Sequence, residues 1–463
     1  MEQIKENKMG TMPVKKLLVT MSLPMVISMF IQAMYNLIDS VFVAQINTDA
    51  LTAVGMAFPM QSLMIAFQTG LGVGMNALVS RLLGQKRPDE AGQAAVHGLI
   101  LTAVNYIVFL IVGLCALPMF FSIQTASQAV MDYGVEYLSI VCCCSFGMFA
   151  QICFERFLQA TGKTLLSMVM QGTGAVINIV MDPILIFGVD FLGIPALGVT
   201  GAALATVIGQ IVSAALGIFL HFKFNRELKL RFRGFKLSGS AIGTIYAVGI
   251  PSIIMSALVS VLTFVMNIIL KGYEPEAATA FGVYFKLQSF VYMPVFGMNN
   301  GIVPIIAYNY GAGKGKRITE TLRLGAVAAL ALMLVGFLLF QLAPQFLLSL
   351  FNPTPRLVEI GTVTLRILSF SFPLAGVSIV LSSGFQALGN GFLSMIVFLI
   401  RLVVPALPLA ALLGMLGGLE LLWWAMPISD LVGVAVAAVF MRYMWKKVIK
   451  GISVQESGAG TIS

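Results

Sequence analysis

The stretch QSLMIAFQTGLGVGMNALVSRLLG, residues 61–84, returns as QSFVYMPVFGMNNGIVPIIAYNYG at residues 288–311. The two stretches are 227 residues apart (288 minus 61), and this offset holds without a gap from residue 24 onward. It still holds further along the chain, where LQATG at 158–162 corresponds to FQALG at 385–389. The chain therefore consists of two homologous halves.

The composition is that of an integral membrane protein. Hydrophobic residues make up 59% of the 463 residues, only 10% are charged, and the mean hydropathy is +0.95, outside the range of soluble globular chains. A helix of about 20 apolar residues can cross a bilayer. The sequence predicts an all-α fold with twelve such helices, six in each half. They are expected near residues 15–44, 51–80, 94–121, 129–158, 165–188, 197–221, 239–270, 278–308, 321–350, 357–386, 392–416 and 419–445.

The repeat also predicts how the halves are related. Because six is an even number of spans, both halves have the same orientation and share a pseudo-twofold axis along the membrane normal. We expect an N-terminal lobe at 1–222, a basic cytoplasmic linker at 223–238, a C-terminal lobe at 239–450 and a cytoplasmic tail at 451–463. Two related bundles in a membrane are typical of alternating-access transporters.

The basic residues follow membrane topology. The formal net charge of +9 could indicate binding of nucleic acid. All but five of the 28 lysines and arginines, however, lie in the N-terminal tail, the even-numbered loops and the C-terminal tail, or at the ends of the spans that adjoin them. Such an excess marks the cytoplasmic side of a membrane protein. The distribution predicts a multi-pass protein of the plasma membrane with both termini in the cytoplasm, and no nucleic-acid partner.

Residues that would indicate catalysis or a structural metal are sparse. His97 and His221 have no cysteine or carboxylate at metal-ligand spacing beside them. The run of three cysteines at 142–144 cannot form a tetrahedral site, because consecutive helical residues point about 100° apart. The segment GAGKGKR at 311–317 lacks the preceding strand and the Ser or Thr of a phosphate-binding loop. These features argue against an enzyme and against a cofactor.

Asp182 is the strongest functional candidate inside a predicted span. A charged side chain at the centre of a membrane helix costs about 2.5–3.5 kcal/mol on insertion scales, so such residues are functional candidates by default. Asn178 lies one turn earlier on the same face, and Pro183 disfavours helical geometry at Asp182. We expect a kinked helix whose amide, carboxylate and freed carbonyl bind a proton or a cation. The alternative is a purely structural kink.

Asp39 is a second candidate of the same kind. Tyr35 and Asn36 precede it by four and three residues, so the three side chains share one face of the first predicted helix. The alternative is an interfacial acid without a role. The second half of the chain lacks these polar groups, which argues for a function in the first. The corresponding residues are Met266 for Asp39, Pro405 for Asn178 and Leu409 for Asp182.

The C-terminal lobe carries mainly positive charge at membrane depth. Lys286, Arg366 and Arg401 lie inside predicted spans, and Asp430 of the last span is their obvious partner. Buried charges in membranes generally pair. We expect Lys286 or Arg401 to pair with Asp430, and any unpaired basic residue to line a cavity that disfavours cations.

Three motifs resemble the multidrug and toxic compound extrusion (MATE) family of transporters. They are NIVMDPILIFG at 178–188, GVTGAALAT at 198–206, and the repeated Gln-Ala-x-Gly ends of the fourth and tenth predicted helices. The resemblance extends over residues 12–447. It is greatest to the branch of cationic-drug exporters that carries acidic residues in the N-terminal lobe.

The resemblance implies two six-helix lobes that form a V, and drug efflux driven by entry of protons or Na+. It implies a coupling-ion site, for a proton or Na+, made of Asp39, Asn178, Asp182 and Thr200. The expected substrate cavity is lined by Tyr35, Asn36, Lys286, Arg401 and Asp430. Some relatives carry essential acids in the seventh and tenth helices, but residues 241–270 and 363–386 contain no Asp or Glu. Sodium coupling through an acid of the C-terminal lobe is therefore not expected.

We thus expect a monomeric antiporter that exports amphipathic cations, with small-molecule substrates and membrane lipid as its partners and no cofactor besides the coupling ion. A flippase of the same superfamily, moving a lipid-linked precursor or an anionic substrate, is the first alternative, and the basic C-terminal lobe favours it. A receptor or scaffold that transports nothing is the second. That function would require a sizeable soluble domain, which none of the predicted loops or tails is long enough to form.

Overall fold

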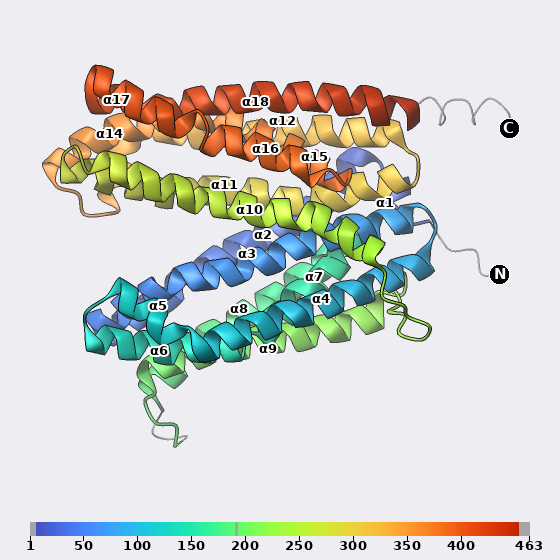
Figure 1. The fold of residues 1–463 in the computed structure, drawn as a ribbon, viewed down its shortest axis with the longest axis horizontal. Helices are drawn as coiled ribbons and strands as arrows, with labels where there is room; N and C mark the ends of the chain where they lie inside the picture. The colour runs from blue at the N-terminus through green and yellow to red at the C-terminus, as the bar shows by residue number, and fades with distance from the viewer. Residues whose placement is uncertain (1–5, 190–192, 453–463) are drawn as a thin grey trace. The chain divides into compact units, whose positions relative to one another are not determined.

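The computed structural model describes residues 6–189 and 193–452, and the regular elements in this part of the chain are helices (Figure 1). The elements of the first half are α1 (Lys8–Thr11), α2 (Val14–Ala44), α3 (Thr48–Gly84), α4 (Pro88–Cys115), α5 (Leu117–Gln124), α6 (Gln128–Cys143), α7 (Phe146–Ala160), α8 (Thr164–Phe187) and α9 (Gly198–Phe224).

From α2 onward the second half repeats this order of elements, with one exception. It comprises α10 (Gly239–Leu270), α11 (Pro275–Gly311), α12 (Gly315–Leu342), α13 (Pro344–Ser349), α14 (Pro355–Ser369), α15 (Ser371–Ala387), α16 (Gly391–Leu402), α17 (Ala406–Trp423) and α18 (Ala425–Met444), with a final π-helical turn at Trp445–Ile449. The exception is that α16 and α17 together correspond to α8. The short helices α5 and α13 occupy corresponding places in the two halves.

The number of membrane helices agrees with the expectation. Within the described residues, eleven helical stretches are long and apolar enough to cross a membrane. The pair α6 and α7, bent by 46° at its junction, supplies one more. The prediction of an all-α protein with twelve transmembrane helices is therefore confirmed.

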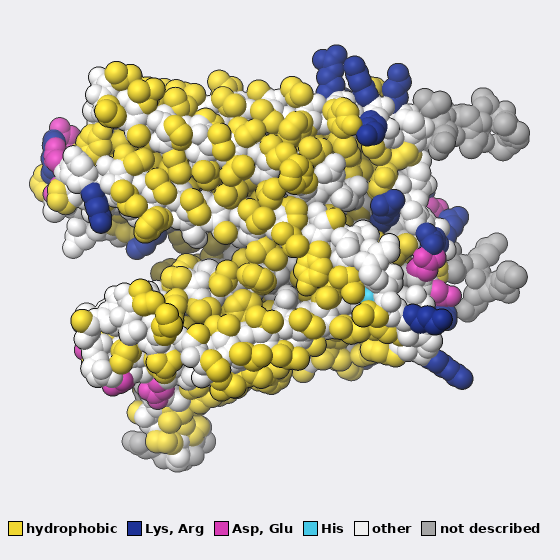
Figure 2. Space-filling view, in the orientation of Figure 1, with side chains coloured by type: hydrophobic (Ala, Val, Ile, Leu, Met, Phe, Trp, Pro, Cys, Tyr) yellow, Lys and Arg dark blue, Asp and Glu magenta, His cyan; other side chains and the backbone are white. Residues whose placement is uncertain are grey.

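The surfaces of these helices are suited to lipid. Hydrophobic side chains cover most of the face shown in Figure 2, and charged side chains gather near helix ends. On α4, Val104, Ile107, Ile111 and Leu114 are spaced three or four residues apart and are all 46% exposed or more. A soluble protein rarely exposes a continuous apolar stripe of this kind. The chain is a multi-pass membrane protein.

The helices form two compact units. The N-terminal unit comprises residues 27–82 and 87–249, and the C-terminal unit comprises the described parts of residues 1–26, 83–86 and 250–463. The boundaries fall inside α2 and α10, close to the repeat-related Pro24 and Pro251. The lobes predicted at 1–222 and 239–450 follow the sequence repeat, whereas these units follow packing. The beginning of α2 therefore belongs to the C-terminal unit, and the beginning of α10 belongs to the N-terminal unit.

Five predicted spans contain a helix break in their interior, contrary to expectation. They are 94–121, 129–158, 321–350, 357–386 and 392–416, and each is divided between two helices. Pro118, Pro344 and Pro405 lie at three of the breaks, where the missing amide ends the hydrogen-bond ladder. At the other two, Ser145 and Ser369 donate to the carbonyl three residues earlier, which competes with helical hydrogen bonding. A sixth predicted span, 419–445, begins in the last turn of α17 and continues as α18.

Candidate functional site

Asn178 and Asp182 lie one turn apart on α8 and are buried in the N-terminal unit. Asn178 Nδ2 donates to Asp182 Oδ1 over 3.4 Å and to Thr206 Oγ1 of α9 over 3.4 Å. The structure thus brings together an amide, a carboxylate and a hydroxyl from two helices. α8 is one helix through Pro183, which lacks the amide that would bond the carbonyl of residue 179.

Two glycines let α8 and α9 approach closely enough for these contacts. A Cβ placed on Gly209 would lie 2.7 Å from the carbonyl oxygen of Gly174 and 3.2 Å from Asn178 Cβ. Real Cβ atoms do not approach other heavy atoms so closely without a shift of one of them. The absence of side chains at Gly174 and Gly209 therefore positions Asn178 next to Thr206.

The second candidate acid, Asp39, lines a cavity of about 370 Å³ in the same unit. Tyr35 and Asn36, its predicted neighbours on α2, line this cavity too, as do Thr206 and Tyr137. Asp182 is not part of this lining, but it belongs to the same unit as Asp39.

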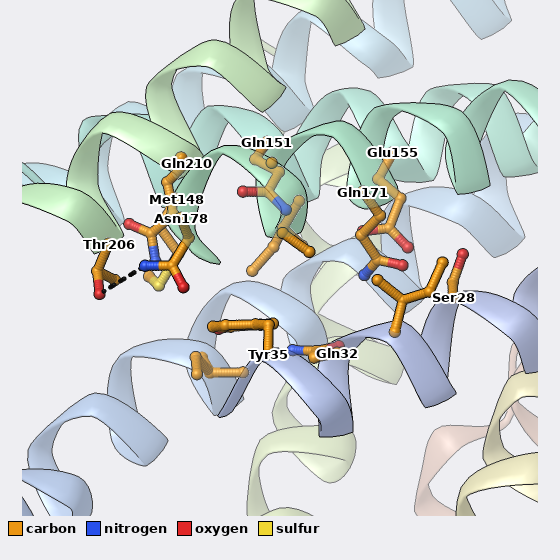
Figure 3. Close-up of a pocket in the computed structure, with 16 residues that line it drawn as sticks. Ser28, Gln32, Tyr35, Met148, Gln151, Glu155, Gln171, Asn178, Thr206 and Gln210 are labelled. Atoms are coloured by element: carbon orange, nitrogen blue, oxygen red, sulfur yellow. Dashed lines mark hydrogen bonds between the residues drawn. The ribbon is translucent and has the colours of Figure 1, made fainter. Parts of the chain in front are cut away.

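A smaller cavity, of about 80 Å³, adjoins the first (Figure 3). Asn178 lines it, and Gln32, Tyr35, Thr206 and Gln210 line both cavities. In Figure 3, Thr206 and Asn178 lie at one end, and Tyr35 projects from α2 below them. The two cavities form a polar interior within a helical bundle whose outer surface is apolar.

Three oxygen atoms of this cluster have no hydrogen-bond partner among the described residues. They are Asp39 Oδ1, Asn178 Oδ1 and Asp182 Oδ2. An unpaired buried acceptor costs about 1–3 kcal/mol. Carboxylate, amide and hydroxyl oxygens are the ligands of hard cations, and a carboxylate can also take up a proton. The residues present therefore suit either Na+ or a proton.

Thr200, which the resemblance implies as an ion ligand, makes a different contact in the structure. Thr200 Oγ1 donates to Glu136 Oε1, and Thr200 is absent from the linings of both cavities. Thr206, one residue of the same motif, takes its place beside Asn178. Six residues rotate a helix by about 600°, so Thr200 and Thr206 face different directions.

In the C-terminal unit, Arg401 and not Lys286 pairs with Asp430, over 2.6 Å. Both partners line a cavity of about 300 Å³ whose walls include Tyr284 and Tyr292. Lys286 is exposed, is not part of this lining and lies over the ring of Phe351. The expectation that Lys286 lines the same cavity as Arg401 and Asp430 is therefore not met.

Residues with metal-binding chemistry are dispersed. Within residues 6–189 and 193–452, no group of three or more His, Cys, Asp or Glu side chains is placed to hold a metal ion. His97 Nε2 instead accepts from the backbone amide of Ser238, and its ring packs against Phe235. His97 thus fixes the linker to α4.

Sequence reasoning missed several polar residues of the N-terminal unit. Thr206, Gln171 and Gln210 line its cavities but carry no charge. Gln171 lies seven residues before Asn178, which is two helical turns on the same face. That spacing was the one available signal.

Known proteins resemble the chain over nearly its whole length. A family model described as MatE matches residues 24–184 and 251–412. The multidrug export protein MepA of Staphylococcus haemolyticus is 28% identical over 92% of this chain and 93% of its own. An FAD transporter of Shewanella oneidensis is 26% identical over 90% of this chain and 92% of its own.

A solved structure supports the same comparison. It is described as the outward-facing conformation of a multidrug resistance MATE family transporter of the MOP superfamily. It matches with a TM-score of 0.89 and 25% identity, over 98% of this chain and 100% of that chain. The family model matches once in each half, as the internal repeat predicts.

Proposed function

Because the chain belongs to the MatE family, the multidrug and toxic compound extrusion transporters, we propose that it exports amphipathic cationic compounds by antiport with protons or Na+. The observation that carries this proposal is a group of buried oxygens on Asp39, Asn178 and Asp182 that have no hydrogen-bond partner among the described residues. Asp39 and Asn178 line the two cavities of the N-terminal unit, and Asp182 is hydrogen-bonded to Asn178. The named activity of the relative MepA, multidrug export, supports the substrate class.

The proposed ion site would couple to substrate through charge. Two carboxylates that share one buried site repel each other when both are ionised, and a cation or proton removes that repulsion. An amphipathic cation in the larger cavity would be held by the same negative charge. Entry of the coupling ion would then weaken substrate binding and favour release, as antiport requires.

The cavity walls suit a mixed set of substrates. Apolar side chains of the larger cavity include Phe58, Met64 and Met148, and polar ones include Gln61. Met side chains adapt to different shapes, and binding surfaces that can repack are typical of promiscuous binders. We therefore propose amphipathic compounds and not a single metabolite as substrates.

The distribution of basic residues supports a membrane location and a topology. We propose a plasma-membrane location with both termini in the cytoplasm, because the basic residues concentrate in the tails and the even-numbered loops. A monomer is proposed, since each proposed ion ligand belongs to the same unit of one chain.

Export of an anionic compound is a second candidate function. Arg401 lines the C-terminal cavity, and one relative is named an FAD transporter, which implies a substrate with phosphate groups in that protein. Arg side chains recognise phosphates and carboxylates. A flippase or an anion exporter would depend on Arg401 more than on Asp182.

Resistance of a drug-sensitive host tests the proposal. Asp182→Asn should abolish the resistance that the wild-type protein confers and leave folded protein in the membrane. Asp132→Asn is the matched control, because Asp132 is exposed on α6 and its carboxylate accepts a hydrogen bond from Gln128. Wild-type resistance from the Asp182→Asn variant would contradict the proposed site.

Dye efflux from reconstituted vesicles separates the coupling ions and the substrates. A pH gradient and a Na+ gradient are imposed separately, with a cationic dye or with FAD inside. Efflux of the cationic dye under one gradient supports drug antiport and identifies the ion. Efflux of FAD alone would support the second candidate.

A further inference from the structure

The polar interior of the N-terminal unit extends beyond the proposed ion site. The smaller cavity is lined by Asn178 and also by Glu155, Gln171 and Ser28. Figure 3 shows these last three residues at one end of the cavity, and Asn178 with Thr206 at the other. Glu155 is only 4% exposed, and the proposed ion site does not use it.

Two helices set the length of this interior. On α2, eleven residues separate Ser28 from Asp39, and on α8 eleven residues separate Gln171 from Asp182. Eleven residues of α-helix rise by roughly 16 Å. The cavity end at Glu155 and the proposed ion site are therefore two different places, joined by the shared linings of the two cavities.

The Glu155 end also contains oxygens that lack partners. Ser28 Oγ, Gln171 Oε1 and Gln210 Oε1 are buried and have no hydrogen-bond partner within the described chain. Ser28 is 1% exposed. Buried polar atoms are normally paired, and exceptions call for a reason such as a bound ion. Oxygens beside a carboxylate are an arrangement that suits a small cation.

The surroundings of Glu155 keep its carboxylate in place. Gln159 Nε2 donates to Glu155 Oε1 over 2.7 Å, and Arg156 Nη1 donates to Gln159 Oε1 over 2.9 Å. Arg156 is not part of the cavity lining, and its side chain packs against Gly72 of α3, where a Cβ would lie 2.8 Å from Arg156 Cγ. These hydrogen bonds orient the Glu155 carboxylate, and they come from residues that do not line the cavity.

The remaining groups around Glu155 leave Arg156 as the main charge nearby. The cavity residues that α2, α8 and α9 contribute beside it are the uncharged Ser28, Gln171 and Gln210. His221 of α9 packs against the rings of Phe154 and Phe157 on the Glu155 helix. The charge of Arg156 balances that of Glu155, which makes a carboxylate tolerable inside a span.

We propose that Glu155, with Gln171 and Ser28, is a second position for the coupling cation. The ligand is a small monovalent cation, hydronium or Na+, which exchanges with the Asp39 and Asp182 position through the N-terminal unit. The inference rests on the proposed antiport and adds a route along which the cation leaves or reaches the first position.

Cation binding to the purified full-length protein tests this site without any transport. Thermal unfolding is followed in detergent at increasing NaCl, with choline chloride as the ionic-strength control, and in acid and alkaline buffers. Cation-dependent stabilisation should be reduced in Glu155→Gln and in Asp182→Asn, and lost in the double variant. Glu136→Gln, the same change at a residue outside both linings, should match wild type. An unchanged cation response of Glu155→Gln would overturn the proposal.

Transport by reconstituted protein supplies the second readout. Glu155→Gln should slow cation-driven dye efflux about ten-fold, the size of a typical coupling between sites, and leave equilibrium dye affinity unchanged. Glu155→Asp, which keeps the carboxylate, should recover part of the rate, so loss of folding is distinguished from loss of the site. An equal loss of dye affinity would instead assign Glu155 to the substrate and overturn the cation position. Failure of wild-type antiport would contradict the proposed function and leave the unfolding test standing.

Discussion

Arg401 of α16 donates through Nε to Asp430 Oδ1 of α18 over 2.6 Å, and the two side chains are 4% and 9% exposed. The approach depends on Gly433, where a Cβ would lie 2.1 Å from Arg401 Cγ. Ser429, one residue before Asp430, donates to the carbonyl of Arg401 over 2.7 Å. The ion pair and this hydrogen bond join α16 to α18 in the C-terminal unit.

Breaking that pair should destabilise the protein. Asp430→Asn or Arg401→Gln leaves its partner buried without a counter-charge, and such changes cost about 3–5 kcal/mol. We expect each single variant to unfold at a clearly lower temperature in detergent. The double variant should lose less than the sum of the two, because no unpaired charge remains. If each single variant were as stable as the wild type, water would have to compensate the charge that remains buried.

The two threonines of α9 should differ in their effect on ion coupling. Thr206 accepts from Asn178, so Thr206→Val should weaken cation-driven dye efflux by about 5- to 10-fold. Thr200→Val removes a hydroxyl bonded to Glu136 and should leave the rate near wild type. Efflux rates under the driving gradient, normalised to the amount of folded protein, provide the measurement. The reverse order of effects would restore the ion site that the family resemblance implied.

The case of Thr200 shows how far the sequence could lead. Asp39, Asn178 and Asp182 were recognisable because charged and amide groups are rare in apolar spans and were absent from the second half. Both threonines lie in the same small-residue motif, and choosing between them requires the rotation of α9 against α8. That rotation depends on contacts such as Gly209 against Gly174, which no local pattern reports.

Helix breaks were predictable only where proline marks them. Hydropathy identified each span because it averages over many residues and is insensitive to a single interruption. Pro344 at the first position of α13 is a local signal that could have divided its span. Ser145 is not, since a serine inside a membrane helix commonly bonds to a carbonyl without breaking it.

Close packing of α8 on α9 should be sensitive to a single methyl group. Gly209→Ala places a Cβ 2.7 Å from the Gly174 carbonyl oxygen, and overpacking of this kind costs about 1–3 kcal/mol. We expect a lower unfolding temperature and slower efflux, because Asn178 moves away from Thr206. Gly243→Ala is the control, since nothing lies within 4 Å of a Cβ there and the residue is helical. If Gly209→Ala behaves like Gly243→Ala, the helices have room that the structure does not show.

The N-terminal segment should loosen from the C-terminal unit as the pH falls. Lys314 Nζ donates to Glu6 Oε1, and this hydrogen bond holds the pKa of the Glu6 carboxyl below its ordinary value. Because the pKa of Glu6 is lower in the folded than in the unfolded protein, this contact contributes its full stability above the pKa of the unfolded state. That contribution is lost as the pH falls through the pKa of the folded state. Glu6 lies at the surface, so solvent screening keeps the effect small.

Hydrogen exchange of the backbone at residues 8–12, corrected for intrinsic rates, measures this loosening. Protection should decrease in acid in wild type, and Glu6→Gln should remove that pH dependence. Arg317 holds the same segment through the carbonyls of Met9 and Met12, and its guanidinium stays charged throughout. Arg317→Gln should therefore lower protection at every pH and keep the acid-dependent step. A pH profile of Glu6→Gln that coincides with wild type would show that another group controls the attachment.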